Sequence, residues 1–387
     1  MQQDHHAARL DGLGTTVFAE MSALALQTGA VNLGQGFPDT DGPIEVSEAA
    51  VEAIRGGANQ YPPGPGIVDL RRAISEHQQR FYDITLDPDT EVVVTTGATE
   101  AVAAALLGLV DPGDEVIALE PFYDSYTAGI QFAGGVRVPV TLRAPDFRLD
   151  VDRLRDAVTP RTRLILLNTP HNPTGAVLSD GELSAVAEIA VERDLVVVTD
   201  EVYEHMTYDG AHRPLSTYPG MRERTLTISS AGKTFSFTGW KVGWASGPAH
   251  LVRAVLMAKQ FLTFVSGAPF QPAVAEGLRL PGSFFAQSLD RLRGKRDRFC
   301  AGLREVGFEV FEPAGTYFVT ADVRPLGWQD GVVFCRDLPH KAGVVAIPHQ
   351  VFYDDVEAGR PLVRFAFCKR DEVLDEALTR LQSLRAR

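Results

Sequence analysis

Three residues that could do chemistry together stand beside hydrophobic runs of the 387-residue sequence. Lys233 follows the run Thr225–Ser229, and Asp200 closes the apolar run Leu195–Thr199. Asn172 lies further upstream in a His-Asn-Pro-Thr-Gly segment. An uncharged lysine amine attacks carbonyl carbons, a buried carboxylate holds a proton on a basic nitrogen, and an amide donates hydrogen bonds. The three groups therefore indicate chemistry between an amine and a carbonyl compound, next to a nitrogen-containing ring.

This combination favours a pyridoxal phosphate enzyme. In such an enzyme the lysine forms a Schiff base with the cofactor's aldehyde, and the carboxylate keeps the pyridine nitrogen protonated. The amide donates to the phenolic oxygen of the ring. A phosphate-binding loop of the Walker A type is the nearest alternative for the segment Gly232-Lys233-Thr234. That loop requires a glycine where Thr227 stands, which excludes it.

The residues between 46 and about 280 alternate short apolar runs with helical patterns such as Thr99–Val110 and Ser179–Arg193. The runs are continuous in valine, isoleucine and leucine, which is typical of strands buried on both faces of a parallel sheet. We expect strands at Glu91–Thr95, Glu115–Leu119, Val136–Leu142, Leu164–Asn168, Leu195–Thr199, Thr225–Ser229 and Val242–Ser246. The pattern predicts a doubly wound, mostly parallel α/β sheet of seven strands, with the functional groups at the carboxyl ends of the strands.

The pattern changes after Pro281. A long charged helix at about Ser283–Val306 and a final helix at about Asp371–Ser383 enclose a series of expected strands. These strands are Phe308–Phe311, Thr316–Asp322, Val344–Ile347 and Leu362–Phe367. Strands followed by helices indicate a smaller α+β domain at residues 281–387, beside a large domain at residues 46–280.

The composition restricts the class of protein. A net charge of −13 argues against nucleic acid and anionic membranes as partners. The three cysteines, Cys300, Cys335 and Cys368, contain no Cys-x-x-Cys pair and fit a reducing compartment. We find neither a secretory signal nor an apolar run long enough to span a bilayer, and so expect a cytoplasmic protein.

The sequence resembles the fold-type I (class I/II) aminotransferases from about Thr16 to the C-terminus. Each motif that carries the resemblance is weak alone, but their order and spacing together are specific. The motifs are Asn32–Pro38, Asn59–Pro62, Thr96–Glu100, Glu120–Tyr123, Asn168–Pro173, Asp200–Tyr203, Lys233–Gly243 and Val363–Phe365. The resemblance also implies that residues 1–45 form an N-terminal arm that joins the small domain.

The resemblance implies a phosphate site at the start of a helix. Gly97, Ala98 and Thr99 follow a strand, and free N–H groups at a helix start bind phosphate well. An ordinary N-cap at Thr99 explains this segment equally well. Ser230 would add a hydroxyl and Lys241 a positive charge. Many relatives have arginine at the Lys241 position, so the contact expected here is a point charge and not a bidentate fork.

The resemblance also implies the residues around the ring. Tyr123 would stack on the pyridine, although a core aromatic is the alternative, and its neighbour Phe122 should point the other way. Asp200 would pair with the ring nitrogen, and Tyr203 and Asn172 would donate to the phenolic oxygen. We interpret His171 as structural.

Substrate binding is implied at three further positions. Arg364 would bind the α-carboxylate through a bidentate pair, with a structural salt bridge as the alternative. Gly36 would let the backbone approach the same carboxylate, next to Asn172. Tyr61 matches a family position that reaches the cofactor phosphate of a neighbouring subunit, which implies a homodimer.

We therefore expect an aminotransferase that moves an amino group from an amino acid to a 2-oxo acid, with 2-oxoglutarate as the expected acceptor. The sequence as a whole, including the segment Tyr61–Gly66, resembles most closely the N-succinyl-LL-diaminopimelate aminotransferases of lysine biosynthesis. The kynurenine, glutamine, methionine and aromatic transaminases are the alternative, because they share the same site residues. A cysteine-S-conjugate β-lyase shares them too. The effector domain of a transcription regulator is disfavoured, because too few residues precede Asn32 for a winged helix.

Overall fold

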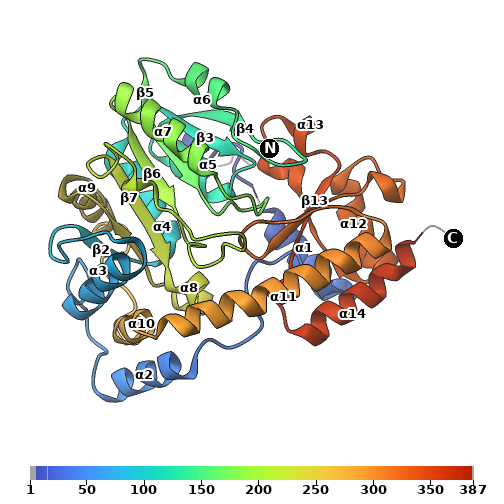
Figure 1. The fold of residues 1–387 in the computed structure, drawn as a ribbon, viewed down its shortest axis with the longest axis horizontal. Helices are drawn as coiled ribbons and strands as arrows, with labels where there is room; N and C mark the ends of the chain where they lie inside the picture. Colours follow the sequence, from blue (N-terminus) through green and yellow to red (C-terminus); the bar gives the residue numbers. More distant parts are fainter. Residues whose placement is uncertain (1–5, 15, 386–387) are drawn as a thin grey trace.

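The computed structural model describes residues 6–14 and 16–385. Residues 1–5 and 15 of the predicted arm, and residues 386–387, lie outside the described residues. A seven-stranded sheet with the order β2-β8-β7-β6-β5-β3-β4 forms the centre of the larger part of the molecule (Figure 1). Its strands are β2 (Val92–Thr95), β3 (Glu115–Glu120), β4 (Val136–Thr141), β5 (Thr162–Asn168), β6 (Val196–Asp200), β7 (Thr225–Ser230) and β8 (Gly243–Ser246). All pairs are parallel except those of β8, which confirms the predicted mostly parallel α/β sheet.

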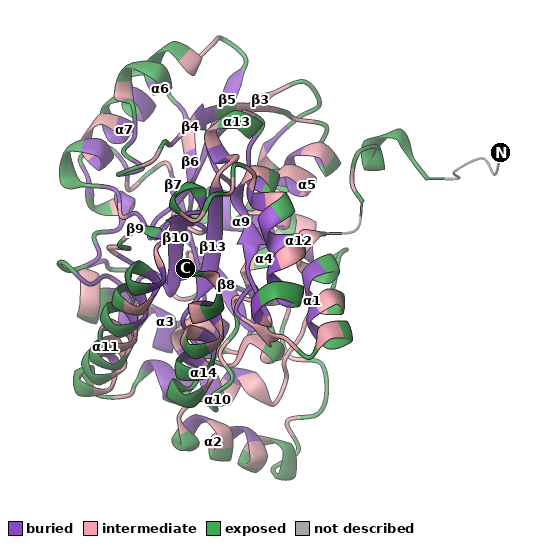
Figure 2. Ribbon diagram, turned by 90° about the vertical axis from the view of Figure 1, so that its right-hand side faces the viewer, coloured by how far each residue is buried: buried purple, intermediate pink, exposed green. Residues whose placement is uncertain are grey.

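Helices cover both faces of this sheet, which is why its strands are apolar without alternation. Val116 and Val198 face a cluster that includes α4 (Gly97–Leu109), α5 (Asp124–Phe132) and α9 (Ala249–Lys259). Their neighbours Ile117 and Val197 face the opposite cluster, which includes α6 (Val151–Ala157) and α7 (Asp180–Glu192). Figure 2 shows the strands buried between helices whose outer sides are exposed. Three further helices, α2 (Ile44–Arg55), α3 (Val68–Tyr82) and α10 (Phe270–Leu278), pack together beside β2.

The smaller part is built on a four-stranded antiparallel sheet of order β12-β13-β10-β9. Its strands are β9 (Glu309–Phe311), β10 (Phe318–Asp322), β12 (Ile347–Pro348) and β13 (Leu362–Ala366). The helices around it are α1 (Val17–Thr28), α11 (Gly282–Val306), α12 (Gly331–Ala342), α13 (Val356–Gly359) and α14 (Asp371–Leu381). The domain boundaries at residues 45 and 280 stay a prediction.

The expectation of one strand at Val344–Ile347 was wrong. Two short strands stand there, β11 (Val344–Val345) and β12. The first pairs in parallel with β1 (Val31–Asn32) in a separate two-stranded sheet, whereas β12 pairs with β13. The chain changes partner at Ala346, and a run of apolar residues carries no signal for such a change.

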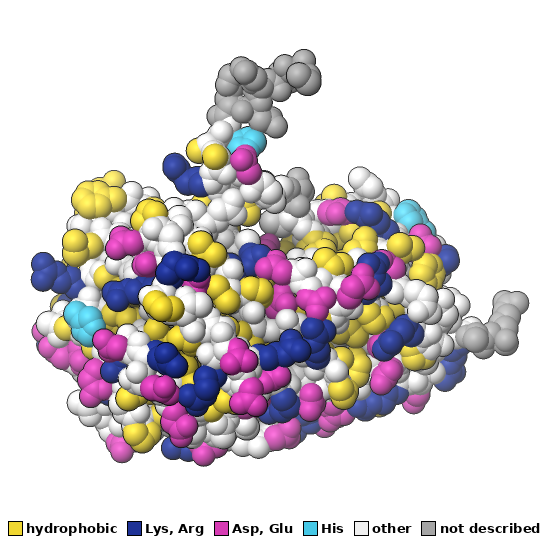
Figure 3. All heavy atoms as spheres, turned by 90° about the horizontal axis from the view of Figure 1, so that it is seen from above, with side chains coloured by type: hydrophobic (Ala, Val, Ile, Leu, Met, Phe, Trp, Pro, Cys, Tyr) yellow, Lys and Arg dark blue, Asp and Glu magenta, His cyan; other side chains and the backbone are white. Residues whose placement is uncertain are grey.

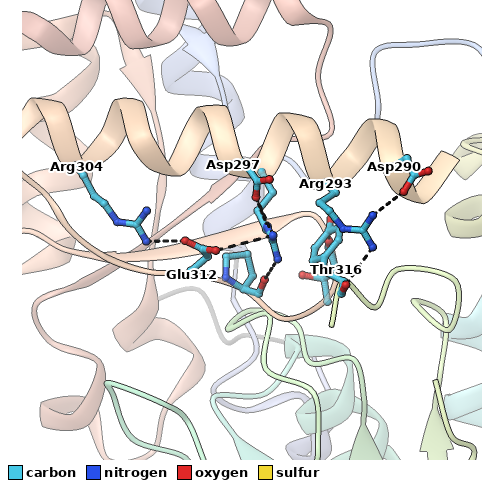
Figure 4. Close-up of polar contacts among 9 residues, drawn as sticks. Asp290, Arg293, Asp297, Arg304, Glu312 and Thr316 are labelled. Atoms are coloured by element: carbon cyan, nitrogen blue, oxygen red, sulfur yellow. Dashed lines mark hydrogen bonds and ion pairs between the residues drawn. The ribbon is translucent and has the colours of Figure 1, made fainter. Parts of the chain in front are cut away.

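The long helix α11 spans the two parts and holds the segment that leads into β10 (Figure 1). Figure 4 shows its polar side chains reaching that segment. Arg304 Nη2 donates to Glu312 at 2.8 Å, and Arg296 Nη1 donates to the carbonyl of Pro313 at 3.2 Å. Thr316 has a positive φ of 64°, which a β-branched residue adopts only when its surroundings impose it. The helix thus fixes the residues directly before Tyr317, which contacts Lys233, and Phe318, which lines the cavity described below.

The surface carries mixed charge. Figure 3 shows cationic and anionic side chains interspersed over one face, with no large area of a single sign. In the part of the chain that the structure describes, no helix is both long and apolar enough to cross a membrane. All three cysteines are buried free thiols.

Candidate active site

The carboxyl ends of the parallel strands meet at one edge of the large sheet, and a cavity opens there. Asp200 is the last residue of β6, Lys233 lies in the short helix α8 (Ala231–Thr234) after β7, and Asn172 follows β5. Because β8 runs antiparallel, its N-terminal end lies at the same edge, which brings in Lys241. The cavity has a volume of about 440 Å³. Of the predicted site residues, it is lined by Gly36, Gly97, Ala98, Thr99, Tyr123, Asn172, Asp200, Tyr203, Ser230, Lys233, Lys241 and Arg364.

The start of α4 forms the predicted phosphate end of the cavity. Gly97 has a φ of +72°, and a Cβ there would lie 3.2 Å from the Nζ of Lys241, so glycine leaves room for the lysine. Thr99 is not the N-cap, which corrects the alternative considered from the sequence. The N-cap is Thr96, and its side chain caps no N–H. The first N–H groups of the helix therefore face the cavity beside Ser230 and Lys241.

Asp200 is buried and held by two donors. The hydroxyl of Tyr126 donates to its Oδ2 at 2.6 Å, and the N–H of Val202 donates to its Oδ1 at 3.4 Å. Burial raises the pKa of Asp200 to about 6, while these two hydrogen bonds and the Lys233 charge oppose the rise. A cationic ring nitrogen next to this carboxylate would supply the partner that a buried charge requires.

Lys233 lines the same cavity. Its Nζ donates to the hydroxyl of Tyr317 at 2.9 Å and to the carbonyl of Gly36 at 3.2 Å. Burial lowers the pKa of Lys233 to about 8, so about a tenth of this amine is uncharged at pH 7. An uncharged amine is the form that acts as nucleophile or base.

In the cofactor-free protein, acylation of Lys233 by a small amine-directed reagent should speed up with rising pH and level off above about pH 8. The pKa of this lysine is lowered, so the ammonium dominates below that pH and the reactive amine above it. An ordinary exposed lysine gains reactivity up to about pH 10. Peptide mass spectrometry after short labelling measures the reactivity of Lys233 and of the exposed lysines in one sample. A Lys233 midpoint no lower than that of the exposed lysines would contradict this assignment.

Arg364 is a fully enclosed cation. Its exposed fraction is 1%, and no carboxylate among residues 6–14 and 16–385 lies within 4.0 Å of it. Instead it donates to the Oδ1 of Asn172 at 2.8 Å and to the carbonyl of Gly34 at 2.7 Å, while its Nε is buried without a partner. The ring of Phe318 lies 4.1 Å from the guanidinium carbon. A structural salt bridge therefore does not explain Arg364, whereas an anion that enters the cavity would.

The remaining predicted ring residues flank the cavity. Tyr123 and Tyr203 both line it. Phe122 points away, as expected, and its ring lies under the guanidinium of Arg137 at 4.3 Å. His171 does not line the cavity and contacts Thr174 at 2.7 Å, and burial lowers its pKa to about 4.

Sequence reasoning missed three residues that hold predicted site residues in place. Tyr126 holds Asp200, Tyr317 holds Lys233, and Asn168 bonds both the carbonyl of Asp200 and the N–H of Asn172, at 2.8 and 2.7 Å. Only Asn168 carried a usable signal, because it ends a strand just as Asp200 does. The contacts of the two tyrosines join separate elements, which no local pattern encodes.

Tyr61 is the one predicted site residue outside the cavity. Its side chain is 83% exposed, and its ring packs edge-on against that of Phe264, 5.6 Å between centroids. Phe261, which is 85% exposed, lies in the same turn as Phe264. Three large aromatic side chains are thus exposed on the surface.

A second polar cluster lies apart from the cavity. Ligand atoms of His77, Glu204 and His205 come within 4.8 Å of one another. The Nε2 atoms of the two histidines are hydrogen-bonded to each other at 2.8 Å, and Glu204 accepts a hydrogen bond from the hydroxyl of Ser229. The Nε2 atoms of the two histidines are therefore occupied by their contact with each other.

The residues of the cavity fit pyridoxal phosphate. Gly97 leaves a hollow beside a lysine and uncapped N–H groups, which suits a phosphate. Asp200 is a buried acid with room for a cationic partner, and Lys233 is a buried amine of lowered pKa for an aldehyde. The buried, unpartnered Nε of Arg364 suits the carboxylate of a substrate beside the cofactor.

Comparisons with known proteins agree with this geometry. The family model "Aminotransferase class I and II" matches residues 28–381. A probable N-succinyldiaminopimelate aminotransferase of Mycobacterium tuberculosis is 57% identical, over 98% of each chain. The methionine aminotransferase of Escherichia coli is 40% identical, over 97% of this chain and 98% of that protein. The solved N-succinyldiaminopimelate aminotransferase of M. tuberculosis superposes with a TM-score of 0.96 at 58% identity, covering 98% of this chain and 100% of the other.

Proposed function

The chain belongs to the class I and II aminotransferases and is a transaminase, and we propose that its amino donor is N-succinyl-LL-diaminopimelate, a reaction of lysine biosynthesis. The 57% identity over 98% of the chain to the mycobacterial enzyme supports this donor most strongly. The family implies pyridoxal phosphate as cofactor, an amino acid as donor and a 2-oxo acid as acceptor. We propose 2-oxoglutarate as that acceptor.

When bound, pyridoxal phosphate supplies an aldehyde that takes up the substrate's amino group and a ring that withdraws electrons from its Cα. The amine of Lys233 would take the proton from the Cα of the donor and, in the second half reaction, give a proton to the Cα of the new amino acid, a role supported by its lowered pKa. The carboxylate of Asp200 keeps the ring nitrogen protonated, and Tyr126 and Val202 hold that carboxylate in place. Tyr203 and the amide of Asn172 donate to the phenolic oxygen.

The phosphate and the substrate are held by separate groups. The N–H groups of Gly97, Ala98 and Thr99 would bind the phosphate together with Ser230 and Lys241. Tyr123 stacks on the ring. Arg364 binds the α-carboxylate, which all amino acids and 2-oxo acids share, and Gly36 lets the backbone come close to it.

A donor screen tests the proposed substrate. Each amino acid is mixed with the enzyme without an acceptor, and the loss of the cofactor's aldehyde absorbance is followed. We expect N-succinyl-LL-diaminopimelate to react with the highest second-order rate constant. The 40% identity to a methionine aminotransferase makes methionine the principal competitor. A clear preference for methionine, kynurenine or glutamine would reject the proposed donor. Pyruvate and ammonia formed from a cysteine conjugate without an acceptor would instead indicate a β-lyase.

Arg364→Lys should raise KM for amino donor and oxo acid alike, by about tenfold or more, with a smaller change in kcat. Both substrates present the same carboxylate, and an ammonium cannot reproduce the planar fork of a guanidinium. Steady-state kinetics with each substrate varied in turn measures this. Arg360→Lys is the matched control, because Arg360 is a half-exposed arginine paired with Glu357 and Asp330. A change confined to one of the two substrates would contradict carboxylate binding by Arg364.

We further propose a homodimer in which Tyr61 reaches the phosphate of the neighbouring site. The exposed pair Tyr61 and Phe264 supports it, because Tyr61 does not line the cavity of its own chain. Mixing Tyr61→Ala with Lys233→Ala, each inactive alone, should then restore activity. One site of each mixed dimer has its own Lys233 and an intact Tyr61 from its neighbour.

Random exchange should yield about a quarter of wild-type activity, because half of the dimers are mixed and each has one complete site. Lys233→Ala mixed with Asp200→Ala is the control. Both residues act within one chain, so neither site of that mixed dimer is complete and its activity should not recover. Subunit exchange is verified by native mass spectrometry. If the mixture of Tyr61→Ala and Lys233→Ala is no more active than Tyr61→Ala alone, the trans placement of Tyr61 is contradicted.

A further inference from the structure

Lys259, the last residue of α9, is a buried lysine that the transamination chemistry does not use. Its exposed fraction is 2%, and no carboxylate in the described parts of the chain lies within 4.0 Å of it. Its Nζ donates to the carbonyls of Gly64 and Phe264, both at 2.9 Å. Burial lowers the pKa of Lys259, and the Glu100 charge opposes this. An ammonium held only by two carbonyls is costly, so its position calls for an explanation.

The two carbonyls belong to two different exposed segments. Gly64 follows Tyr61 in the loop before α3, and Phe264 lies in the turn after α9. Gln271, which is 1% exposed, joins the same two segments a second time. Its Oε1 accepts from the N–H of Ile67 at 2.8 Å, and its Nε2 donates to the carbonyl of Ser266 at 2.7 Å. Lys259 and Gln271 thus form two parallel bridges between the Tyr61 loop and the Phe264 turn.

The bridged turn is strained. Phe264 has a φ of +63°, a conformation that bulky residues adopt only when their surroundings impose it. Its carbonyl is the one that Lys259 holds, and its ring packs against Tyr61. Backbone strain of this kind concentrates where a protein must place a group accurately.

The same turn is tied to the phosphate end of the chain's own cavity. The carboxylate of Glu100, in the first turn of α4, accepts from the hydroxyl of Thr263 and from the N–H of Thr96. The hydroxyls of Thr96 and Thr263 are 3.0 Å apart. A continuous set of hydrogen bonds therefore runs from the start of α4 through the turn to the Tyr61 loop.

We propose that Lys259 and Gln271 are positioning residues that fix Tyr61 and Phe264 for the neighbouring site and join them to the phosphate end of their own site. This inference rests on the proposed dimer with Tyr61 in trans. Each chain thereby offers its neighbour Tyr61, and the position of Tyr61 is set in part by α4, the helix that binds the phosphate in the chain's own site. Loss of the bridges weakens cofactor retention in the neighbouring site by misplacing Tyr61, without any change in the residues that line that cavity within the chain.

A double-mutant cycle on cofactor retention tests this, with the dissociation constant measured by absorbance titration of the intact dimer. Lys259→Met keeps the length of the side chain and removes its donors. We expect it to raise the dissociation constant about tenfold in the wild-type background. In the Tyr61→Phe background, where the hydroxyl is already absent, the same change should raise it less than about twofold. Lys295→Met is the matched control, because Lys295 also donates to a loop carbonyl, that of Lys369 in the smaller part.

The outcomes separate the two proposals. Equal effects of Lys259→Met in both backgrounds, or no effect in the wild-type background, overturn the positioning role alone. A Tyr61→Phe enzyme that retains cofactor as well as wild type overturns the trans placement of Tyr61, and the positioning role with it. Thermal unfolding of each variant is measured in parallel. If Lys259→Met does not fold, the same cycle is run with Gln271→Met. Its effect on the dissociation constant should likewise be smaller in the Tyr61→Phe background than in the wild type.

Discussion

Lys233→Ala should abolish transamination, with kcat reduced by about 10⁴-fold or more, while cofactor binding stays measurable. The variant loses both the amine that attaches the aldehyde and the base that moves the Cα proton. The start of α4, Ser230 and Lys241 still line the phosphate end, so the cofactor still binds. The purified protein should lack the yellow absorbance of the wild type. Reduction with borohydride, followed by mass spectrometry, should leave no cofactor attached to the chain.

Lys341→Ala is the control for this experiment, because Lys341 is exposed and pairs with Asp337 on the surface. Its activity and its borohydride labelling at Lys233 should match wild type. Borohydride labelling of the wild-type enzyme at another lysine, Lys241 included, would refute the assignment.

Asp200→Ala should lower kcat by about 10²–10³-fold and change cofactor occupancy far less. Its carboxylate stabilises positive charge on the ring nitrogen during removal of the Cα proton, and this interaction matters most in the transition state. Asp200→Asn keeps the shape without the charge and should lose a similar amount. Rapid-mixing kinetics of the half reaction, with occupancy determined by absorbance, gives both quantities. A variant within about tenfold of wild type, about 1.4 kcal/mol of barrier, would mean that the ring nitrogen has another partner.

Tyr126→Phe gives a graded version of the same test. The hydroxyl of Tyr126 stabilises the ionised form of Asp200 and so lowers its pKa. Removing it raises that pKa, and Asp200 is then protonated at a higher pH than in the wild type. The acid limb of the pH–rate profile should therefore move to higher pH.

The sequence predicted the parts of the fold and site that depend on local pattern. The apolar runs that became β6 and β7 were recognised because both faces of the sheet are covered, and the residues at their ends, Asp200 and Lys233, meet in one cavity because parallel strands share an edge. The change of strand partner between β11 and β12 was not predictable. Every residue from Val344 to Ile347 is buried, so the sequence pattern is the same before and after the change.

The missed site residues depend on contacts between distant elements. Tyr317 reaches Lys233 because α11 and the segment before β10 set its position, and its own neighbours in sequence say nothing of that. The bridges made by Lys259 are likewise invisible in sequence, where a lysine at a helix end resembles any exposed lysine. The proposed role of Tyr61 was accessible only through family resemblance.

The antiparallel direction of β8 has a practical consequence for redesign. It places Lys233 and Lys241 on one short connection that enters and leaves the same edge of the sheet. That connection is tightly packed: a Cβ on Gly232 would lie 3.1 Å from the Cα of Thr238, and the rings of Phe237 and Trp240 stack at 4.0 Å. A tag, label or grafted loop inserted there would separate the two lysines and disrupt that stacking. Libraries for altered substrate preference should therefore keep residues 232–242 fixed and vary the walls around the substrate instead.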